Sequence, residues 1–302
     1  MPKEINSCTV GIAGFGLMGG AIALSLHNRC NVSINNIFAC DKDSETLNAA
    51  QQEGLIGKGW LTDNAGEMLS LCDIVFLCMN PSTIIRFIEK WESSFKSGCL
   101  ITDIAGTKES IAAAAEKIRD DVDFIPGHPM AGSHVRPGKK SDFTQSRFNN
   151  CASCDFTGKN YILTTISRNK NENISFLKDL IYKMGFSRIT EVSPQEHDRK
   201  IAFTSQLCHV IAASLIHCES DTEITRFGGG SFEDLTRIAM LNAPMWTELF
   251  IENRGMLLDR INQFEKSLNA IKSLIGDENA EELEAILTLV RNRRSEMVSA
   301  KE

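Results

Sequence analysis

The chain has no long apolar segment. No run approaches the roughly 18 consecutive apolar residues of a transmembrane helix, and Met1–Val10 contains no apolar signal core. The chain also lacks an excess of basic residues, because 32 Lys and Arg stand against 39 Asp and Glu, for a formal net charge of −7. This balance disfavours broad binding to nucleic acids or anionic membranes. We therefore expect a cytoplasmic protein that has neither as a partner.

Cysteine is too dilute to form a disulfide scaffold, with ten residues in a chain of 302. Most of these cysteines fall in apolar runs or helical patterns, where a free thiol behaves as a small hydrophobic group. Cys151 and Cys154 form a CxxC pair, but no second pair or ligating histidine lies near them in the sequence. We expect reduced thiols and no bound metal.

The first part of the chain alternates short apolar runs with helical patterns. Helical patterns cover Leu17–Leu26 and Ser44–Glu53, and Arg136–Gly158 is polar and predicts a loop. Strands are expected at Cys8–Ala13, Ile37–Cys40, Ile74–Met79, Cys99–Ile104, Phe124–Pro126, Tyr161–Thr165 and Arg188–Val192. This alternation predicts βαβ units and a mostly parallel sheet, that is, an α/β domain of the Rossmann type.

From Pro194 onward strand signals disappear and helical periodicity takes over. We place a domain boundary there, with an α/β domain over 1–193 and an all-α domain over 194–302. A heptad-like seam runs through Leu257, Ile261, Phe264, Leu268, Ile271 and Ile275. Such a seam buries against a partner helix, either in an internal hairpin or in a dimer interface, and the sequence does not choose between them.

A dinucleotide-binding fingerprint opens the chain. Gly14, Gly16 and Gly19 form GxGxxG between an expected strand and an expected helix, the context that gives the motif its specificity. Asp41 ends the next strand, where an acid accepts hydrogen bonds from ribose hydroxyls and repels a 2′-phosphate, so NAD is favoured over NADP. The expected cofactor contacts also include Phe15, Leu17, Met18, Met79, Asn80 and Pro81.

Three further segments place polar groups where ligands bind an open α/β sheet. They are Thr102–Lys108 at a strand end, the turn Gly127–Gly132 (GHPMAG), and the helical stretch Glu196–Cys218. His128 lies in that turn between glycines and a proline. Beside a dinucleotide fingerprint, such a histidine suggests a base that serves hydride transfer.

The ordered set of these motifs resembles the prephenate/arogenate dehydrogenase family of tyrosine biosynthesis. The resemblance covers GFGLMGGAIA, TDIAGTK, GHPMAG, EHDRKIAFTSQLCH, FEDLTRIA and Trp246, which is essentially the whole chain. It implies an NAD-binding domain joined to an all-helical dimerisation domain, an active site between them and a homodimer. The implied reaction oxidises a cyclohexadienol, and loss of its ring carboxylate as CO2 then yields an aromatic ring.

The resemblance also assigns residue roles. It makes His128 the base that accepts the substrate hydroxyl proton and His209 a contact of the substrate side chain. Arg237 becomes the clamp of the substrate carboxylate, and Trp246 shapes the pocket. On one straight α-helix His197 and His209 lie about 18 Å apart and about 120° around the axis. We therefore expect His209 in the site and His197 at the domain junction.

Two positions depart from the family pattern. Many members have a serine where this chain has Gly106, and Thr107 is the neighbouring hydroxyl that would replace it. Where members often have a glutamate, this chain has His134. We include Gly106, Thr107 and His134 among the expected substrate contacts. The helix that carries Arg237 is expected to begin at an N-cap formed by Ser231, with Arg237 about one turn further on.

The sequence thus predicts an NAD-dependent prephenate dehydrogenase. Arogenate is the alternative substrate, since no residue in the sequence distinguishes the amino group of its side chain from the keto group of prephenate. A β-hydroxyacid-type dehydrogenase would use a lysine on the helix after the boundary, where only Lys200 occurs. A non-catalytic NAD-binding protein would have no need for His128, His209 and Arg237 together.

Overall fold

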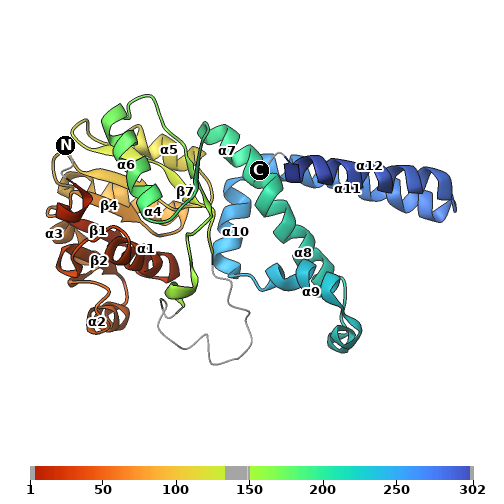
Figure 1. Ribbon diagram of the computed structural model, residues 1–302, viewed down its shortest axis with the longest axis horizontal. Helices are drawn as coiled ribbons and strands as arrows, with labels where there is room; N and C mark the ends of the chain where they lie inside the picture. The colour runs from red at the N-terminus through yellow and green to blue at the C-terminus, as the bar shows by residue number, and fades with distance from the viewer. Residues whose placement is uncertain (1–3, 133–147, 149, 300–302) are drawn as a thin grey trace. The chain divides into compact units, whose positions relative to one another are not determined.

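A six-stranded parallel sheet forms the centre of the α/β part of the molecule (Figure 1). The computed structural model describes residues 4–132, 148 and 150–299. The strands are β1 (Val10–Ala13), β2 (Ile37–Asp41), β3 (Lys58–Leu61), β4 (Ile74–Leu77), β5 (Leu100–Asp103) and β6 (Asp123–Ile125). Their order is β3-β2-β1-β4-β5-β6, with every neighbouring pair parallel. This is the order of the doubly wound dinucleotide-binding fold, as expected.

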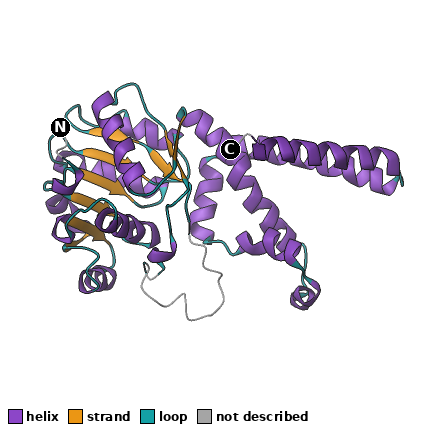
Figure 2. Ribbon diagram, viewed as in Figure 1, coloured by secondary structure: helices purple, strands orange, loops and turns teal. Residues whose placement is uncertain are grey.

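Helices cover both faces of this sheet (Figure 2). One face carries α1 (Leu17–Asn28), α2 (Ser44–Gln52) and α6 (Asn171–Lys183). The other carries α3 (Ala65–Leu69), α4 (Pro81–Trp91) and α5 (Glu109–Ala115). Successive side chains of a strand point to opposite faces, so β4 contributes to both cores. Its continuous apolar run is therefore buried on both sides, as the sequence predicts.

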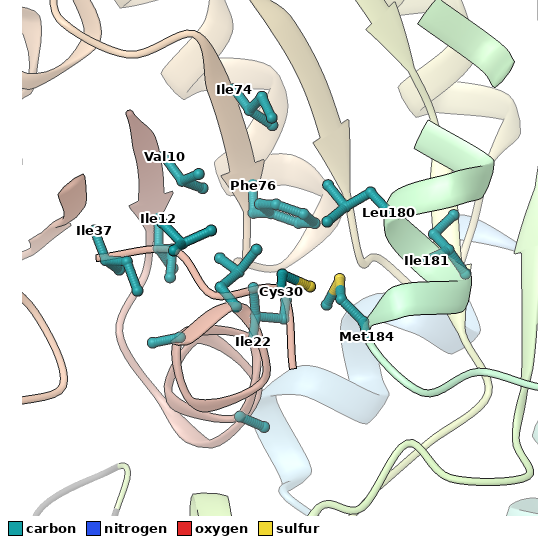
Figure 3. Packing of buried hydrophobic residues seen from close by; sticks show 14 of the residues in the cluster. Val10, Ile12, Ile22, Cys30, Ile37, Ile74, Phe76, Leu180, Ile181 and Met184 are labelled. Atoms are coloured by element: carbon teal, nitrogen blue, oxygen red, sulfur yellow. The ribbon is translucent and has the colours of Figure 1, made fainter. Parts of the chain in front are cut away.

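The core under α1 and α6 is seen from close by in Figure 3. Side chains from the middle of the sheet meet one face of each helix, and all of them are at most 2% exposed. They include Val10, Ile12, Ile22, Ile74, Phe76, Leu180, Ile181 and Met184. This packing holds α6, which is distant in sequence, against β1 and β4, and it makes the sheet a rigid platform for the loops at its carboxyl edge.

A second, three-stranded sheet continues from the first. It consists of β7 (Gly127–Pro129), β8 (Asn160–Leu163) and β9 (Arg188–Glu191), in the order β7-β8-β9. Strand β7 pairs antiparallel with β8, and His128 is opposite Ile162. The expectation that His128 lies in a turn is therefore wrong. A Cβ atom on Gly127 would lie 2.6 Å from the Tyr161 ring, so only glycine lets β7 approach β8 at this point.

The first four helices after Pro194 belong to the same compact unit as the sheets, Met1–Asn253. They are α7 (Pro194–Ile201), α8 (Leu207–His217), α9 (Gly230–Thr236) and α10 (Ala243–Glu252). The N-terminus of α7 is fixed by Ser193, whose side chain accepts the Glu196 N–H at 3.1 Å. Residues 202–206 between α7 and α8 form a π-helical turn, and such turns often occur at functional sites.

The second compact unit, Arg254–Glu302, contains α11 (Arg254–Gly276) and α12 (Ala280–Ser299). The two helices pack against each other, so an internal hairpin does form. Apolar side chains nevertheless remain outside it, because Leu268 and Ile275 of the predicted seam are 52% and 60% exposed. Among the described residues, no helix has the length and hydrophobicity needed to cross a membrane.

Candidate active site

The glycine loop between β1 and α1 has the geometry of a phosphate-binding turn. Gly14 has φ +91°, and a Cβ atom there would lie 2.5 Å from the Cys78 carbonyl oxygen. A Cβ atom on Gly19 would lie 2.4 Å from the Gly14 carbonyl oxygen, so this glycine permits close helix–strand packing. A Cβ atom on Gly16 would meet nothing within 4 Å. The loop therefore leaves open space where a pyrophosphate would approach the N-terminus of α1.

Asp41 ties the end of β2 to this loop. Its Oδ2 accepts the main-chain N–H of Phe15 at 2.8 Å, and its Oδ1 accepts that of Asp43 at 3.1 Å. The Phe15 side chain is fully buried, with its ring against that of Phe148, so only its main chain faces the loop. Leu17 and Met18 are half-buried and also pack on the core. These residues fit an NAD site, with Asp41 beside the glycine loop.

Strand β4 ends beside the same loop. Met79, Asn80 and Pro81 follow it, and Pro81 begins α4. A Cβ atom on Gly14 would lie 2.8 Å from Met79 Cγ, which shows how closely the two loops approach. The N-terminus of α4 is already occupied, because Glu248 of α10 accepts the Ser82 N–H at 2.7 Å. No motif in the sequence marks Glu248, because its contact with Ser82 joins residues far apart in the chain.

Asp103, at the end of β5, organises the Thr102–Lys108 loop. Its carboxylate accepts the main-chain N–H groups of Ala105 at 2.8 Å and Gly127 at 3.1 Å, and it forms a fully buried ion pair with Lys108. Desolvation lowers the pKa of Lys108, while Asp103 opposes this shift. Because Gly127 precedes His128, Asp103 connects this loop to the strand that carries the predicted base.

The loop also contains Gly106 and Thr107, two of the expected substrate contacts. A Cβ atom on Gly106 would lie 3.2 Å from Leu249 Cδ2, so a larger residue there would press on α10. Thr107 is 2% exposed, and its hydroxyl has no hydrogen-bond partner among the described residues. His134 lies outside the described residues.

His128 contacts a second histidine directly. Its Nδ1 is 2.9 Å from Nε2 of His197, and Nδ1 of His197 is 2.7 Å from Oδ1 of Asp198. Asp198 also accepts the main-chain N–H groups of Lys108 and Glu109, which holds α7 to the start of α5. Burial, followed by the nearby His197 and Lys108, lowers the pKa of His128 well below its usual value. The neutral form, the one able to accept a proton, is therefore favoured.

The assumption of one straight α-helix through His197 and His209 is wrong, because a π-helical turn lies between them. His197 joins α7 to β7 through its contact with His128. The adjacent pair His197–Asp198 is visible in the sequence as part of the EHD motif. Its contact with residue 128 depends on the packing of α7 against α5.

His209 and Trp246 form a second cluster. Their rings stack with centroids 3.7 Å apart, and Nδ1 of His209 is 2.9 Å from the Ser205 carbonyl oxygen. Burial is the main cause that lowers the pKa of His209, and the positive charge of Arg237 lowers it further. The turn Arg237–Ala239, which follows α9, packs on α8. The structure thus brings His209, Trp246 and Arg237 together.

The predicted Ser231 N-cap is wrong. Helix α9 begins at Gly230 and its N-cap is Gly229, with no side-chain capping bond. The Gly229 carbonyl accepts the N–H groups of Phe232 and Glu233 at 3.0 and 3.1 Å. Main-chain geometry at consecutive glycines therefore sets the start of this helix.

A polar chain buried behind these clusters connects their helices. The side-chain amide of Asn253 donates to the Asp198 carbonyl at 2.9 Å and to Gln206 Oε1 at 2.8 Å. Gln206 in turn donates to the Leu249 carbonyl at 3.1 Å. These bonds join α7, the π-helical turn and α10, the elements that carry or contact His197, His209 and Trp246. The sequence analysis did not identify Gln206 or Asn253.

All ten cysteines are free thiols. Cys151 and Cys154 are buried beside α1, and burial raises the pKa of Cys154 to about 11, which disfavours the reactive thiolate. Within residues 4–132, 148 and 150–299, no group of three or more His, Cys, Asp or Glu side chains is placed to hold a metal ion.

Comparison with known proteins agrees with this architecture. Residues 22–190 match the family described as "Prephenate dehydrogenase, nucleotide-binding domain", and residues 193–289 match "Prephenate dehydrogenase, dimerization domain". The chain is 30% identical over 287 residues to the prephenate dehydrogenase of Bacillus subtilis, covering 91% of this chain and 72% of that protein. It is 25% identical over 280 residues to the cyclohexadienyl dehydrogenase of Zymomonas mobilis, covering 91% and 90%.

A solved structure is similar over its full length. The prephenate dehydrogenase from A. aeolicus, in complex with hydroxyphenyl propionate and NAD+, superimposes with a TM-score of 0.80 at 26% identity. The match covers 98% of this chain and 100% of that one. The fold and the glycine loop define an NAD-dependent dehydrogenase. The chain belongs to the prephenate dehydrogenase family.

Proposed function

We propose that this protein oxidises and decarboxylates prephenate to 4-hydroxyphenylpyruvate, with NAD as hydride acceptor, in the biosynthesis of tyrosine. The observation that carries this proposal is the half-buried histidine on β7, His128, whose pKa is lowered by desolvation and by the nearby His197 and Lys108, so that its neutral form is favoured. The names of the relatives from Bacillus subtilis and Lactococcus lactis support the choice of prephenate, at 30% identity each.

His128 is the proton acceptor in this proposal. As the hydride leaves the carbinol carbon, the hydroxyl proton moves to the neutral imidazole and the oxygen becomes a carbonyl oxygen. Loss of CO2 from the ring then gives an aromatic product. Hydrogen bonds from Gly127 to Asp103 and from His128 to His197 keep the imidazole in one position for this transfer.

The substrate is anchored by the cluster on the helices. Arg237 is exposed and offers a planar pair of donors to a carboxylate. His209 and Trp246 form a stacked wall near it. Gly106 has no side chain of its own, and the Leu249 side chain of α10 packs against it. We include Thr107 and His134 among the substrate contacts on the family resemblance alone.

Arogenate is a second candidate, favoured by one observation. A carbonyl oxygen only accepts hydrogen bonds, so Nδ1 of His209 carries the proton that it shares with Ser205. Neutral His209 then offers only an acceptor at Nε2. An acceptor suits the ammonium group of arogenate, whereas the keto group of prephenate requires a donor. The relative from Zymomonas mobilis is named a cyclohexadienyl dehydrogenase, and this name does not specify the side chain of its substrate.

The remaining parts of the proposal concern assembly and location. We propose a homodimer formed through residues 194–302, where the dimerisation family matches and apolar side chains of α11 and α12 are exposed. The proposed boundary near Ser193 then separates an NAD-binding part, residues 1–193, from a substrate-binding and dimerisation part, residues 194–302. Helices α7–α10 belong to the second part by function, although they lie in the same compact unit as the sheets. The free thiols support a location in the reducing cytoplasm.

The deciding experiment offers purified protein each pairing of prephenate or arogenate with NAD or NADP and records absorbance of the reduced cofactor. We expect the highest kcat/KM with prephenate and NAD. A higher kcat/KM with arogenate would identify arogenate as the substrate and would leave the proposed mechanism unchanged. Inactivity in all four pairings would overturn the proposed function.

A further inference from the structure

Three side chains from two elements form a continuous hydrogen-bonded chain beside the predicted base. His128 comes from β7, whereas His197 and Asp198 come from α7. The contacts run from His128 Nδ1 to His197 Nε2 at 2.9 Å and from His197 Nδ1 to Asp198 Oδ1 at 2.7 Å. His197 is 1% exposed and Asp198 4%, so water does not compete for these contacts.

The direction of each hydrogen bond follows from Asp198. Its carboxylate accepts two main-chain N–H groups, Lys108 at 2.8 Å and Glu109 at 2.9 Å. An ionised carboxylate only accepts hydrogen bonds, so the proton in the contact with His197 lies on Nδ1 of His197. A neutral imidazole carries one ring proton, and Nε2 of His197 must therefore be an acceptor.

The proton between the two histidines then belongs to His128. Because Nε2 of His197 accepts, Nδ1 of His128 donates, and the lone pair of neutral His128 is left on its Nε2. We propose that His197, held by Asp198, acts as a positioning residue that fixes His128 as the Nδ1–H tautomer and so makes Nε2 the proton acceptor. This inference rests on the proposed role of His128 as the base.

The surrounding charges support this protonation pattern. The charged or titratable groups near the two histidines are Lys108, Asp103 and Asp198. Burial is the main cause that lowers the pKa of each histidine, which keeps both neutral before the reaction. Lys108 is paired with Asp103, so the Asp198 carboxylate is directed to His197 and to main-chain donors.

The same chain stabilises the state after proton transfer. The substrate O–H bond breaks, its electron pair stays on oxygen to form the carbonyl, and the proton forms a new N–H bond at Nε2 of His128. His128, which is half-buried, then carries a positive charge. Its Nδ1–H bond to His197 strengthens, and the negative charge of Asp198, one ring further along, offsets the charge without a rearrangement.

The tautomer is tested directly by NMR on the full-length protein with 15N-labelled histidine. The chain has six histidines, and His128→Asn identifies the signals of His128 by their loss. At a pH where the ring is neutral, we expect His128 to have a protonated Nδ1 and an unprotonated Nε2. The opposite pattern, with the proton on Nε2, would overturn the inference whatever the enzymatic activity.

Two substitutions of His197 test the hydrogen-bond acceptor of its side chain separately from the size of the side chain. In His197→Gln the amide oxygen can still accept from His128, whereas His197→Leu fills similar space without an acceptor. We expect Gln to retain the Nδ1–H tautomer and Leu to allow protonation of Nε2. We also expect kcat of the Leu variant to be lower than that of the Gln variant by about tenfold or more, with similar KM. His217→Gln, on the exposed end of α8, is the matched control and should change neither readout.

The outcomes distinguish this inference from the proposed function. Equal tautomers and equal kcat in the Gln and Leu variants would contradict the inference while leaving a dehydrogenase intact. The expected tautomer in an enzyme that keeps its kcat after His128→Asn would contradict the role of His128 as base. If the Leu variant does not fold, the wild-type tautomer and the Gln variant still decide the question.

Discussion

The carboxylate of Asp41 accepts the main-chain N–H of Phe15 at 2.8 Å, so the acid at the end of β2 holds the glycine loop. One residue therefore connects two parts of the cofactor site. A carboxylate at this place can accept hydrogen bonds from ribose hydroxyls as well as from N–H groups. Its negative charge is the feature that would discriminate against a 2′-phosphate.

Replacing Asp41 with Asn should therefore change cofactor preference more than it changes the loop. The amide oxygen can still accept the Phe15 N–H, but the charge is lost. We expect KM for NAD to rise by roughly 10-fold and the NADP/NAD ratio of kcat/KM to increase, since charged hydrogen bonds contribute about 1.5–3 kcal/mol. Steady-state kinetics with both cofactors measure this. Asp63→Asn, at an exposed acid paired with Lys90, is the control. An unchanged NADP/NAD ratio would remove Asp41 from cofactor selection.

Replacing His128 with Asn should remove the proton acceptor and leave the cofactor site intact. We expect kcat to fall by about 100-fold or more, the typical contribution of general acid–base catalysis, while the Kd for NAD stays within about twofold. Single-turnover kinetics and a fluorescence titration with NAD measure the two quantities. A variant with nearly wild-type kcat would mean that another group accepts the proton.

Replacing Arg237 with Gln should weaken substrate binding. Loss of a bidentate donor to the carboxylate should raise KM for the substrate by roughly 10- to 100-fold, with a smaller effect on kcat. Arg226→Gln is the matched control, because Arg226 is exposed and pairs with Glu223 on a neighbouring turn. If KM is the same in both variants, Arg237 is not the carboxylate clamp.

Three histidines with lowered pKa values should make stability depend on pH between about 7 and 5. The pKa values of His128, His197 and His209 are all lowered, chiefly by burial, relative to the unfolded value of about 6.5. Below that value the unfolded chain binds more protons than the folded chain. The free energy of unfolding should therefore decrease as the pH falls from about 7 to 5.

Urea unfolding at several pH values measures this dependence. The His128→Asn variant should show a weaker dependence than the wild type, because one of the three groups is gone. His217→Gln should match the wild type, since this histidine is exposed. A free energy of unfolding that is constant over the window, or one that increases toward pH 5, would contradict the argument.

Introducing a charge on the apolar surface of α11 should weaken the proposed dimer. Leu268 is 52% exposed beside α12, and burial of such a side chain between subunits would stabilise their association. We expect Leu268→Lys to raise the dimer Kd by at least about tenfold, measured by sedimentation. Ser267→Lys adds the same charge one residue away on an exposed position and is the control. Equal Kd values would place the interface elsewhere.

The sequence by itself determined the features that depend on neighbouring residues. The glycine spacing from Gly14 to Gly19 predicts the tight turn, and the apolar run at Ile74–Met79 predicts a strand. The loss of strand signals after Pro194 predicts the helical part. These features are local, because backbone sterics and side-chain periodicity act over a few residues.

The tertiary structure decided what depends on residues that are far apart. Strand β7 is only Gly-His-Pro and forms because it pairs with β8, so its sequence reads as a turn. The π-helical turn invalidates the straight-helix geometry from which His197 was assigned to the junction. The contact between His128 and His197 joins residues 69 positions apart. The sequence motifs identify both histidines. Their ring nitrogens come within hydrogen-bond distance only because α7 packs against α5 and β7 pairs with β8.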